Sequence, residues 1–126
     1  MNNAPLDRRV LVVEDEMMVA GMLRRMLADL GYSVVGPATT IDEAMKMIDS
    51  GGIDAAVLDI NLDGQMSYPV ADELNTRGIP FVFSTGYGGE GLPNGYEQFS
   101  LLKKPFRRSR LGAALADLLA AEQSNA

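Results

Sequence analysis

Three carboxylates stand at the ends of short apolar segments. Glu14 and Asp15 directly follow the run RVLVV, and Asp59 follows the run AAVL. Carboxylates held within several ångströms of one another repel, and a nearby cation relieves that repulsion. Mg²⁺ suits such a set, because it accepts one or two carboxylates, a carbonyl oxygen and waters, and leaves a position for a phosphoryl oxygen. If the three acids meet in the fold, they predict a magnesium site.

A hydroxyl and an amine end two further apolar segments. Thr85 follows the run FVFS, and Lys104 lies between the run SLLK and Pro105. A lysine supplies a compact positive charge for a phosphoryl group, and a threonine hydroxyl supplies a hydrogen-bond donor. Together with the acids, these residues predict a site for a transient acyl phosphate on Asp59.

The composition excludes several other kinds of chemistry. The 126 residues include no cysteine and no histidine, so disulfides, thiolate metal sites and histidine-based catalysis are ruled out. The net charge of −6 argues against nucleic-acid binding. Because the apolar runs are only a few residues long and the amino terminus has no apolar signal region, we expect a cytoplasmic protein without a membrane segment.

Apolar periodicity predicts the elements that position these residues. Strands are expected at residues 9–13, 33–35, 53–60, 79–84 and 99–103. Helices are expected at residues 17–30, from 40 to the glycines at 51 and 52, at 68–77, and around 111–119. This alternation predicts an α/β fold with a five-stranded, doubly wound parallel sheet. The carboxyl ends of its strands would bring the acids, the hydroxyl and the amine to one edge.

Two features refine this expectation. The stretch from Tyr87 to Gln98 is rich in glycine and contains a proline, and each glycine costs a helix about 1 kcal/mol, so the fourth helix is expected to be short or missing. Met22, Met26 and Met45 are expected to fill the core. The length fits a single domain, residues 1–126, with its core at about 8–121.

The motifs, in this order, resemble those of a response-regulator receiver domain over nearly the whole chain. They are Glu14-Asp15, Asp59, Thr85-Gly86 and Lys104-Pro105-Phe106. The run FSTG also resembles the signature of a Phe-x-Thr-Gly subgroup of single-domain receivers, in which a poorly formed fourth helix is a known trait. The resemblance implies a flavodoxin-like receiver fold.

The resemblance also implies a role for each site residue. Asp59 would be the phosphoacceptor, attacking a phosphohistidine on a sensor histidine kinase. The Mg²⁺ ligands would be Asp15, Asp59, the backbone carbonyl of Asn61 and, through a bound water, Glu14. Lys104 would pair with the phosphoryl group, and Thr85 would move to bond it.

The sequence therefore predicts a stand-alone response regulator of a two-component phosphorelay. It would catalyse only its own phosphorylation and dephosphorylation, and would act on a phosphotransfer protein or a downstream effector rather than on outside substrates. One alternative is a small Mg²⁺-dependent phosphohydrolase, although Asn61 stands where a second acid would be needed. Another is a phosphate-independent adaptor. Leu101 replaces an aromatic residue usual in the family, and Leu62-Asp63 replace a common Met-Pro, and these departures leave the adaptor open.

Overall fold

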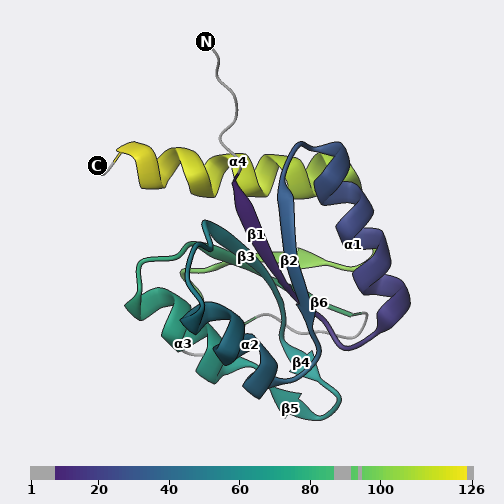
Figure 1. Ribbon diagram of the computed structural model, residues 1–126, viewed down its shortest axis with the longest axis vertical. Helices are drawn as coiled ribbons and strands as arrows, with labels where there is room; N and C mark the ends of the chain where they lie inside the picture. The colour runs from purple at the N-terminus through teal and green to yellow at the C-terminus, as the bar shows by residue number, and fades with distance from the viewer. Residues whose placement is uncertain (1–7, 87–91, 94, 125–126) are drawn as a thin grey trace.

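The fold is a parallel β-sheet between two layers of helices, as a computed structural model describes it for residues 8–86, 92–93 and 95–124. The sheet has the strand order β2-β1-β3-β6-β7. Its strands are β1 (Arg9–Val13), β2 (Ser33–Ala38), β3 (Ala55–Asp59), β6 (Phe81–Thr85) and β7 (Ser100–Lys103). The helices are α1 (Met17–Asp29), α2 (Ile41–Asp49), α3 (Tyr68–Thr76) and α4 (Arg108–Ser124). α1 and α4 lie over one face of the sheet, and α2 and α3 lie over the other (Figure 1).

This arrangement confirms the predicted doubly wound α/β fold, with one strand longer than expected. β2 continues past residue 35, through Gly36 and Pro37, to Ala38. Proline is tolerated in β2 because it is an edge strand, which pairs with β1 alone among the described strands. Gly36 has a φ of 101°, and a Cβ there would come within 2.9 Å of the carbonyl oxygen of Val12, so this close approach requires glycine.

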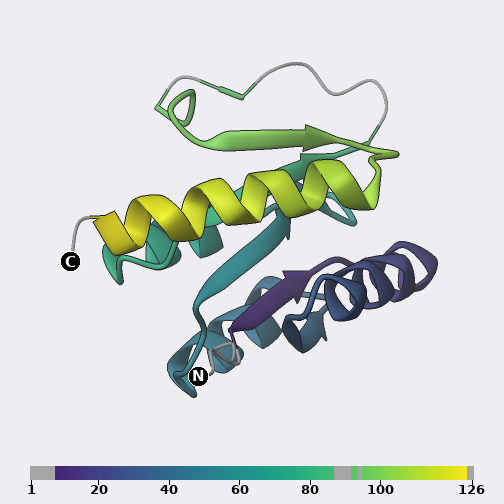
Figure 2. The ribbon, with the colours of Figure 1, turned by 90° about the horizontal axis from the view of Figure 1, so that it is seen from above.

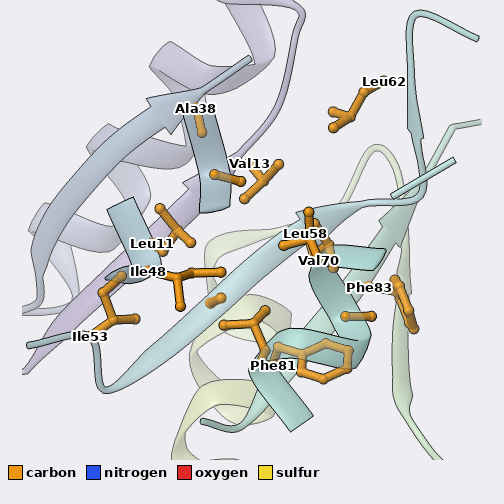
Figure 3. Packing of buried hydrophobic residues seen from close by; sticks show 14 residues of the cluster. Leu11, Val13, Ala38, Ile48, Ile53, Leu58, Leu62, Val70, Phe81 and Phe83 are labelled. Carbon is orange, nitrogen blue, oxygen red and sulfur yellow. The ribbon is translucent and has the colours of Figure 1, made fainter. Parts of the chain in front are cut away.

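Alternating side chains of the strands build a core on each face of the sheet. In β1, Val10 and Val12 pack towards α1 and α4, whereas Leu11 and Val13 pack towards α2 and α3. β3 and β6 follow the same alternation, and Figure 3 shows Leu11, Leu58 and Phe83 in the cluster beneath α2 and α3. Burying such a side chain contributes about 1.5–3 kcal/mol, so the central strands are fixed tightly.

α1 packs on the sheet through a narrower stripe than the sequence predicts. Leu23 and Leu27 are buried, and Met26 packs partly against them. The prediction that Met22 belongs to the core is wrong, because its side chain is 52% exposed. Met22 is one residue before Leu23, which turns it about 100° away from the buried stripe. None of the described helices is long and apolar enough to cross a membrane.

α2 begins where the sequence predicts a helix start, and Thr40 caps it. The backbone N–H of Glu43 donates to Thr40 Oγ1 at 3.1 Å. The Glu43 carboxylate accepts hydrogen bonds from the backbone N–H and the hydroxyl of Thr39, at 2.7 and 2.9 Å. These bonds lower the pKa of Glu43. The reciprocal contacts fix where the chain leaves β2 and enters α2.

The segment between β6 and β7 contains no helix among its described residues, 86, 92–93 and 95–99. The predicted loss of the fourth helix is confirmed to that extent, and residues 87–91 and 94, including Tyr87, lie outside the described part. Tyr96 anchors the segment to α3, because its ring stacks on Tyr68 at 4.7 Å and its hydroxyl donates to Asp72 at 2.9 Å. The bond to Asp72 also raises the pKa of Tyr96.

A two-stranded hairpin that the sequence analysis did not predict lies beyond the carboxyl end of β3 (Figure 1). It pairs β4 (Asn61–Leu62) with β5 (Gln65–Met66) in antiparallel orientation. Its turn residues, Asp63 and Gly64, have φ values of 52° and 93°. Two successive positive φ angles are typical of the tight turn that matches strand twist, and Asp-Gly is a favoured pair for it.

Candidate functional site

The carboxyl edge of the sheet brings together residues that are far apart in the sequence. Strand order reverses between β1 and β3, and ligands of open α/β sheets bind beside such a reversal. Glu14 follows β1, Asp59 is the last residue of β3, and Lys104 follows β7. The backbone N–H of Lys104 donates to the carbonyl oxygen of Thr85 at 2.8 Å, which continues the β6–β7 pairing up to the site.

A buried group of three charges forms at this edge. Lys104 Nζ donates to Glu14 Oε1 at 2.7 Å and to Asp59 Oδ2 at 3.1 Å. The side chains of Glu14 and Asp59 are only 1% and 8% exposed, and that of Lys104 is 14% exposed. The lysine therefore balances one of the two negative charges on carboxylates that are almost shielded from water.

The surroundings shift the pKa values of two of these groups. Burial raises the pKa of Glu14, the charge of Asp59 adds to that rise, and the bond from Lys104 opposes it. Burial alone would lower the pKa of Lys104, but the hydrogen bonds and charges of Glu14 and Asp59 outweigh it and raise the pKa. Lys104 is thus held in its charged form, whereas Glu14 is held as a carboxylate at a cost in free energy.

Asp15 completes a set of acids that suits a divalent cation. One carboxylate oxygen from each of Glu14, Asp15 and Asp59 lies within 4.8 Å of the others. Three carboxylates and the ammonium of Lys104 give a formal charge of −3 + 1 = −2. Hard oxygen ligands with a charge of −2 match Mg²⁺ in both ligand type and charge. The donor set therefore fits the predicted metal.

Ser67, which the sequence analysis missed, holds the backbone of Asp59. Its fully buried hydroxyl donates to the carbonyl oxygen of Asp59 at 2.6 Å, and its N–H donates to the carbonyl oxygen of Ile60 at 2.8 Å. The hairpin returns the chain to the end of β3 and so makes both bonds possible. The Asp63-Gly64 pair was the signal in the sequence that predicts such a return.

Two other predicted residues lie at the site without joining its ion pairs. The backbone N–H of Asn61 approaches Asp59 Oδ1 at 3.4 Å, and its side-chain oxygen accepts a hydrogen bond from the N–H of Gly64 at 2.7 Å. The hydroxyl of Thr85 makes no hydrogen bond to Glu14, Asp59 or Lys104. The structure thus brings together four predicted residues, Glu14, Asp15, Asp59 and Lys104, and leaves Thr85 beside them at the same edge.

The sequence of this site and its sheet matches a known family. Residues 10–116 match the family described as the response regulator receiver domain. The chain belongs to this family. Receiver domains are signalling modules of two-component systems, so the chain is a receiver of that kind.

Known receiver domains resemble the chain over most of its length. The phyllosphere-induced regulator PhyR of Methylorubrum extorquens is 32% identical over 125 residues, which cover 96% of this receiver and 47% of PhyR. The chain thus spans about half the length of the curated relatives it matches. The solution structure of SdrG from Sphingomonas melonis Fr1 is similar with a TM-score of 0.77 and 39% identity, covering 92% of this receiver and 96% of SdrG. The BeF3-activated conformation of SdrG gives a TM-score of 0.76 with 41% identity, covering 88% and 95% of the two chains.

Proposed function

We propose that this receiver domain accepts a phosphoryl group from a sensor histidine kinase on Asp59 and signals through contact with another protein. The observation that carries the proposal is the buried contact of Lys104 Nζ with Glu14 and Asp59, beside Asp15, at the reversal point of the sheet. Asp59 is the acceptor in this proposal because it ends the central strand β3 and contacts Lys104. Its backbone is tied to Ser67 and its Oδ2 to Lys104.

Asp59, Lys104 and Thr85 each have a separate role in the proposed phosphoryl transfer. An Asp59 carboxylate oxygen forms a bond to phosphorus as the P–N bond of the donor phosphohistidine breaks and its imidazole leaves. Lys104 then lies beside the new phosphoryl oxygens, where its positive charge balances theirs. The Thr85 hydroxyl, without a bond to Glu14, Asp59 or Lys104, is available to donate to the same group.

The proposal includes Mg²⁺ as the cofactor. Glu14, Asp15, Asp59 and the backbone carbonyl of Asn61 would hold it, as the three-carboxylate cluster supports. When bound, Mg²⁺ supplies positive charge that offsets the charge of the transferring phosphoryl group. The chain's own contribution is to keep its carboxylates together before the metal arrives, through Lys104.

Phosphorylation by a small donor tests the acceptor. With Mg²⁺ and acetyl phosphate, intact-mass spectrometry should detect one added phosphoryl group, and Asp59→Asn should abolish it. Asp63→Asn is the matched control, because Asp63 is an exposed acid four residues further along and should remain without influence. Unchanged labelling of Asp59→Asn would remove Asp59 from the role.

Two further assays test the alternative functions, a small phosphohydrolase and a phosphate-independent adaptor. Repeated release of inorganic phosphate from p-nitrophenyl phosphate would support a phosphohydrolase. A folded protein that takes up neither phosphate nor beryllofluoride would support a phosphate-independent adaptor.

Thr85 is proposed as the residue that senses the phosphoryl group. Thr85→Ala should still be phosphorylated, but its amide NMR spectrum should lose the shifts that beryllofluoride causes at β6 and β7 away from the site. Thr85→Ser keeps the hydroxyl and should restore them. Full shifts in Thr85→Ala would show that switching does not need this residue.

The proposal further treats residues 1–126 as one receiver domain, with its core at about 8–121. The family match over residues 10–116 and the similarity to 96% of the SdrG chain support this view. Its partners would then be the kinase and either a phosphotransfer protein or an effector, in the cytoplasm. Apart from its own phosphorylation and dephosphorylation it would catalyse no reaction.

A further inference from the structure

Ser84 places a hydroxyl inside the sheet, directly beside the acidic site. Its side chain is buried, and its Oγ has no hydrogen-bond partner among the described residues. No other buried side-chain nitrogen or oxygen in the described part of the chain is left in this condition. A buried hydroxyl without a partner lowers stability, and alanine would fill the same position without that cost. The hydroxyl therefore calls for a functional explanation.

Strand register puts Ser84 next to Asp59. The two residues are paired between β6 and β3, and on its other side Ser84 is paired with Leu102 of β7. Val57 and Val82, two residues before Asp59 and Ser84, pack towards α1 and α4. Side chains two residues apart in a strand share a face, so Asp59 and Ser84 lie on this face as well.

The side chain of Lys104 passes over the end of β6 to reach the acids. β6 lies between β3 and β7, and Figure 2 shows β7, in light green, at the edge of the sheet. Lys104 comes two residues after Leu102, which packs towards α1 and α4, and therefore starts on the face that carries Ser84. Its Nζ contacts Asp59 at the end of β3, at 3.1 Å. Ser84 is the residue of β6 that lies on this path.

The ammonium of Lys104 has one more donor than its hydrogen bonds use. It carries three N–H groups, and two of them donate, to Glu14 at 2.7 Å and to Asp59 at 3.1 Å. The third has no acceptor among the described residues. An unused donor and an unused hydroxyl oxygen that can accept are thus close to each other at the same edge of the sheet.

We propose that Ser84 is a positioning residue, whose hydroxyl accepts a hydrogen bond from Lys104 Nζ once a phosphoryl group is on Asp59. This inference rests on the proposed phosphorylation of Asp59. Two carboxylates now draw the ammonium towards β1 and β3. In the acyl phosphate the Asp59 carboxyl no longer carries its charge, so that attraction weakens. The three N–H groups then have three acceptors, which are Glu14, a phosphoryl oxygen and Ser84 Oγ, and the hydroxyl keeps the ammonium against the phosphoryl group.

A purely steric role for Ser84 predicts a different outcome. The lysine side chain needs a small residue beneath it, and alanine would meet that need equally well. A steric role therefore predicts that Ser84→Ala keeps every property of the site. The proposed hydrogen bond predicts that Ser84→Ala weakens only the state with a phosphoryl group or its mimic.

Beryllofluoride, as a mimic of the phosphoryl group, tests the bond in the full chain. Titrations in Mg²⁺ followed by amide NMR should give Ser84→Ala a dissociation constant about tenfold or more above that of the parent. Ser84→Thr keeps the hydroxyl and should stay within about threefold of the parent, whereas Ser84→Cys, a weak hydrogen-bonding group of similar size, should resemble Ser84→Ala. Mg²⁺ alone should bind Ser84→Ala within about twofold of the parent, because the bond to Lys104 forms only with the phosphoryl group.

Two measurements separate a hydrogen bond from a packing effect. The Nζ signal of Lys104 in nitrogen NMR reports proton exchange with water, which beryllofluoride should slow in the parent and not in Ser84→Ala. Urea denaturation in EDTA should show no loss of stability in Ser84→Ala, since the hydroxyl has no described partner to lose. Ser100→Ala, at the exposed start of β7, is the matched control and should leave both measurements unchanged.

The outcomes distinguish this inference from the proposed function. Equal beryllofluoride affinity in the parent and Ser84→Ala, full affinity in Ser84→Cys, or a clear loss of stability of Ser84→Ala in EDTA would overturn the role of Ser84 and leave phosphorylation of Asp59 standing. A parent that neither takes up a phosphoryl group from acetyl phosphate nor binds beryllofluoride would overturn both.

Discussion

Replacing Lys104 by methionine tests whether one ammonium group allows two carboxylates to be buried together. Methionine keeps most of the side-chain length and removes the charge. Glu14 and Asp59 would then share a pocket in which their side chains are 1% and 8% exposed, without a cation between them.

The expected loss follows from the distances. At an effective dielectric constant of about 20, the 2.7 Å pair attracts by about 6 kcal/mol and the 3.1 Å pair by about 5 kcal/mol. Desolvation of the ammonium offsets much of this attraction, and removing one partner of a buried pair costs about 3–5 kcal/mol. Glu14 can also take up a proton more easily because its pKa is raised, which limits the loss. We therefore expect the free energy of unfolding to fall by about 3 kcal/mol at neutral pH.

Urea denaturation followed by circular dichroism measures this loss, first in EDTA and then in saturating Mg²⁺. The metal should narrow the difference between variant and parent, because a divalent cation replaces the missing charge more effectively in the more negative site. Lys103→Met is the control, since Lys103 is exposed and its replacement should change stability by less than about 0.5 kcal/mol. A loss below about 1 kcal/mol in EDTA, or a loss that Mg²⁺ does not alter, would refute the reasoning.

Three further outcomes are expected. In EDTA, the raised pKa of Glu14 in the folded state should make stability depend on pH. The stabilising contribution of Glu14 is fully present below its unfolded pKa, near 4.5, and is lost as the pH rises through its folded pKa. Between these two pKa values only the folded state keeps the proton. Urea titrations at several pH values should show this fall in the parent and not in Glu14→Gln, and an identical profile in the two would contradict it. Thr40→Ala removes the cap of α2 and should cost about 1 kcal/mol in the same measurement, whereas no loss would mean that the capping bond is not important in solution. Tyr96→Phe removes the bond to Asp72, and should cost about 0.5–1.5 kcal/mol and speed hydrogen exchange of residues 95–99, so unchanged exchange would argue against this anchor.

The sequence was sufficient for the centre of the sheet because its central strands are buried on both faces. Continuous apolar runs such as RVLVV and AAVL mark β1 and β3 with little ambiguity. The extension of β2 was missed because glycine and proline normally end a strand, and only the edge position of β2 makes them acceptable. Met22 was misjudged because periodicity gives the direction of an apolar face but not how far the neighbouring elements cover it.

The candidate site was predictable for residues that directly end or follow a strand. Glu14, Asp59 and Lys104 meet because parallel strands carry their carboxyl ends to one edge, which follows from topology alone. Ser67 was not predictable in the same way, since its bond to Asp59 depends on a hairpin of two-residue strands that has no apolar alternation. Side-chain pairing inside the site, such as the contact of Lys104 with Glu14, also lay beyond sequence reasoning.

Lys104 connects the stability of the fold with the proposed phosphoryl chemistry. Its bond to Asp59 must be exchanged when a phosphoryl group is added there, but its shorter bond to Glu14 keeps the ammonium at the same place. The positive charge is therefore already in position before transfer. The free-energy cost of positioning it arises when the chain folds and not during the reaction. The cost remains visible in the raised pKa of Glu14, which reports a carboxylate that would be more stable in water. Glu14→Gln removes the buried negative charge of this carboxylate. The variant should therefore fold more stably in the absence of metal and bind Mg²⁺ less tightly, because the same charge lowers stability and attracts the cation.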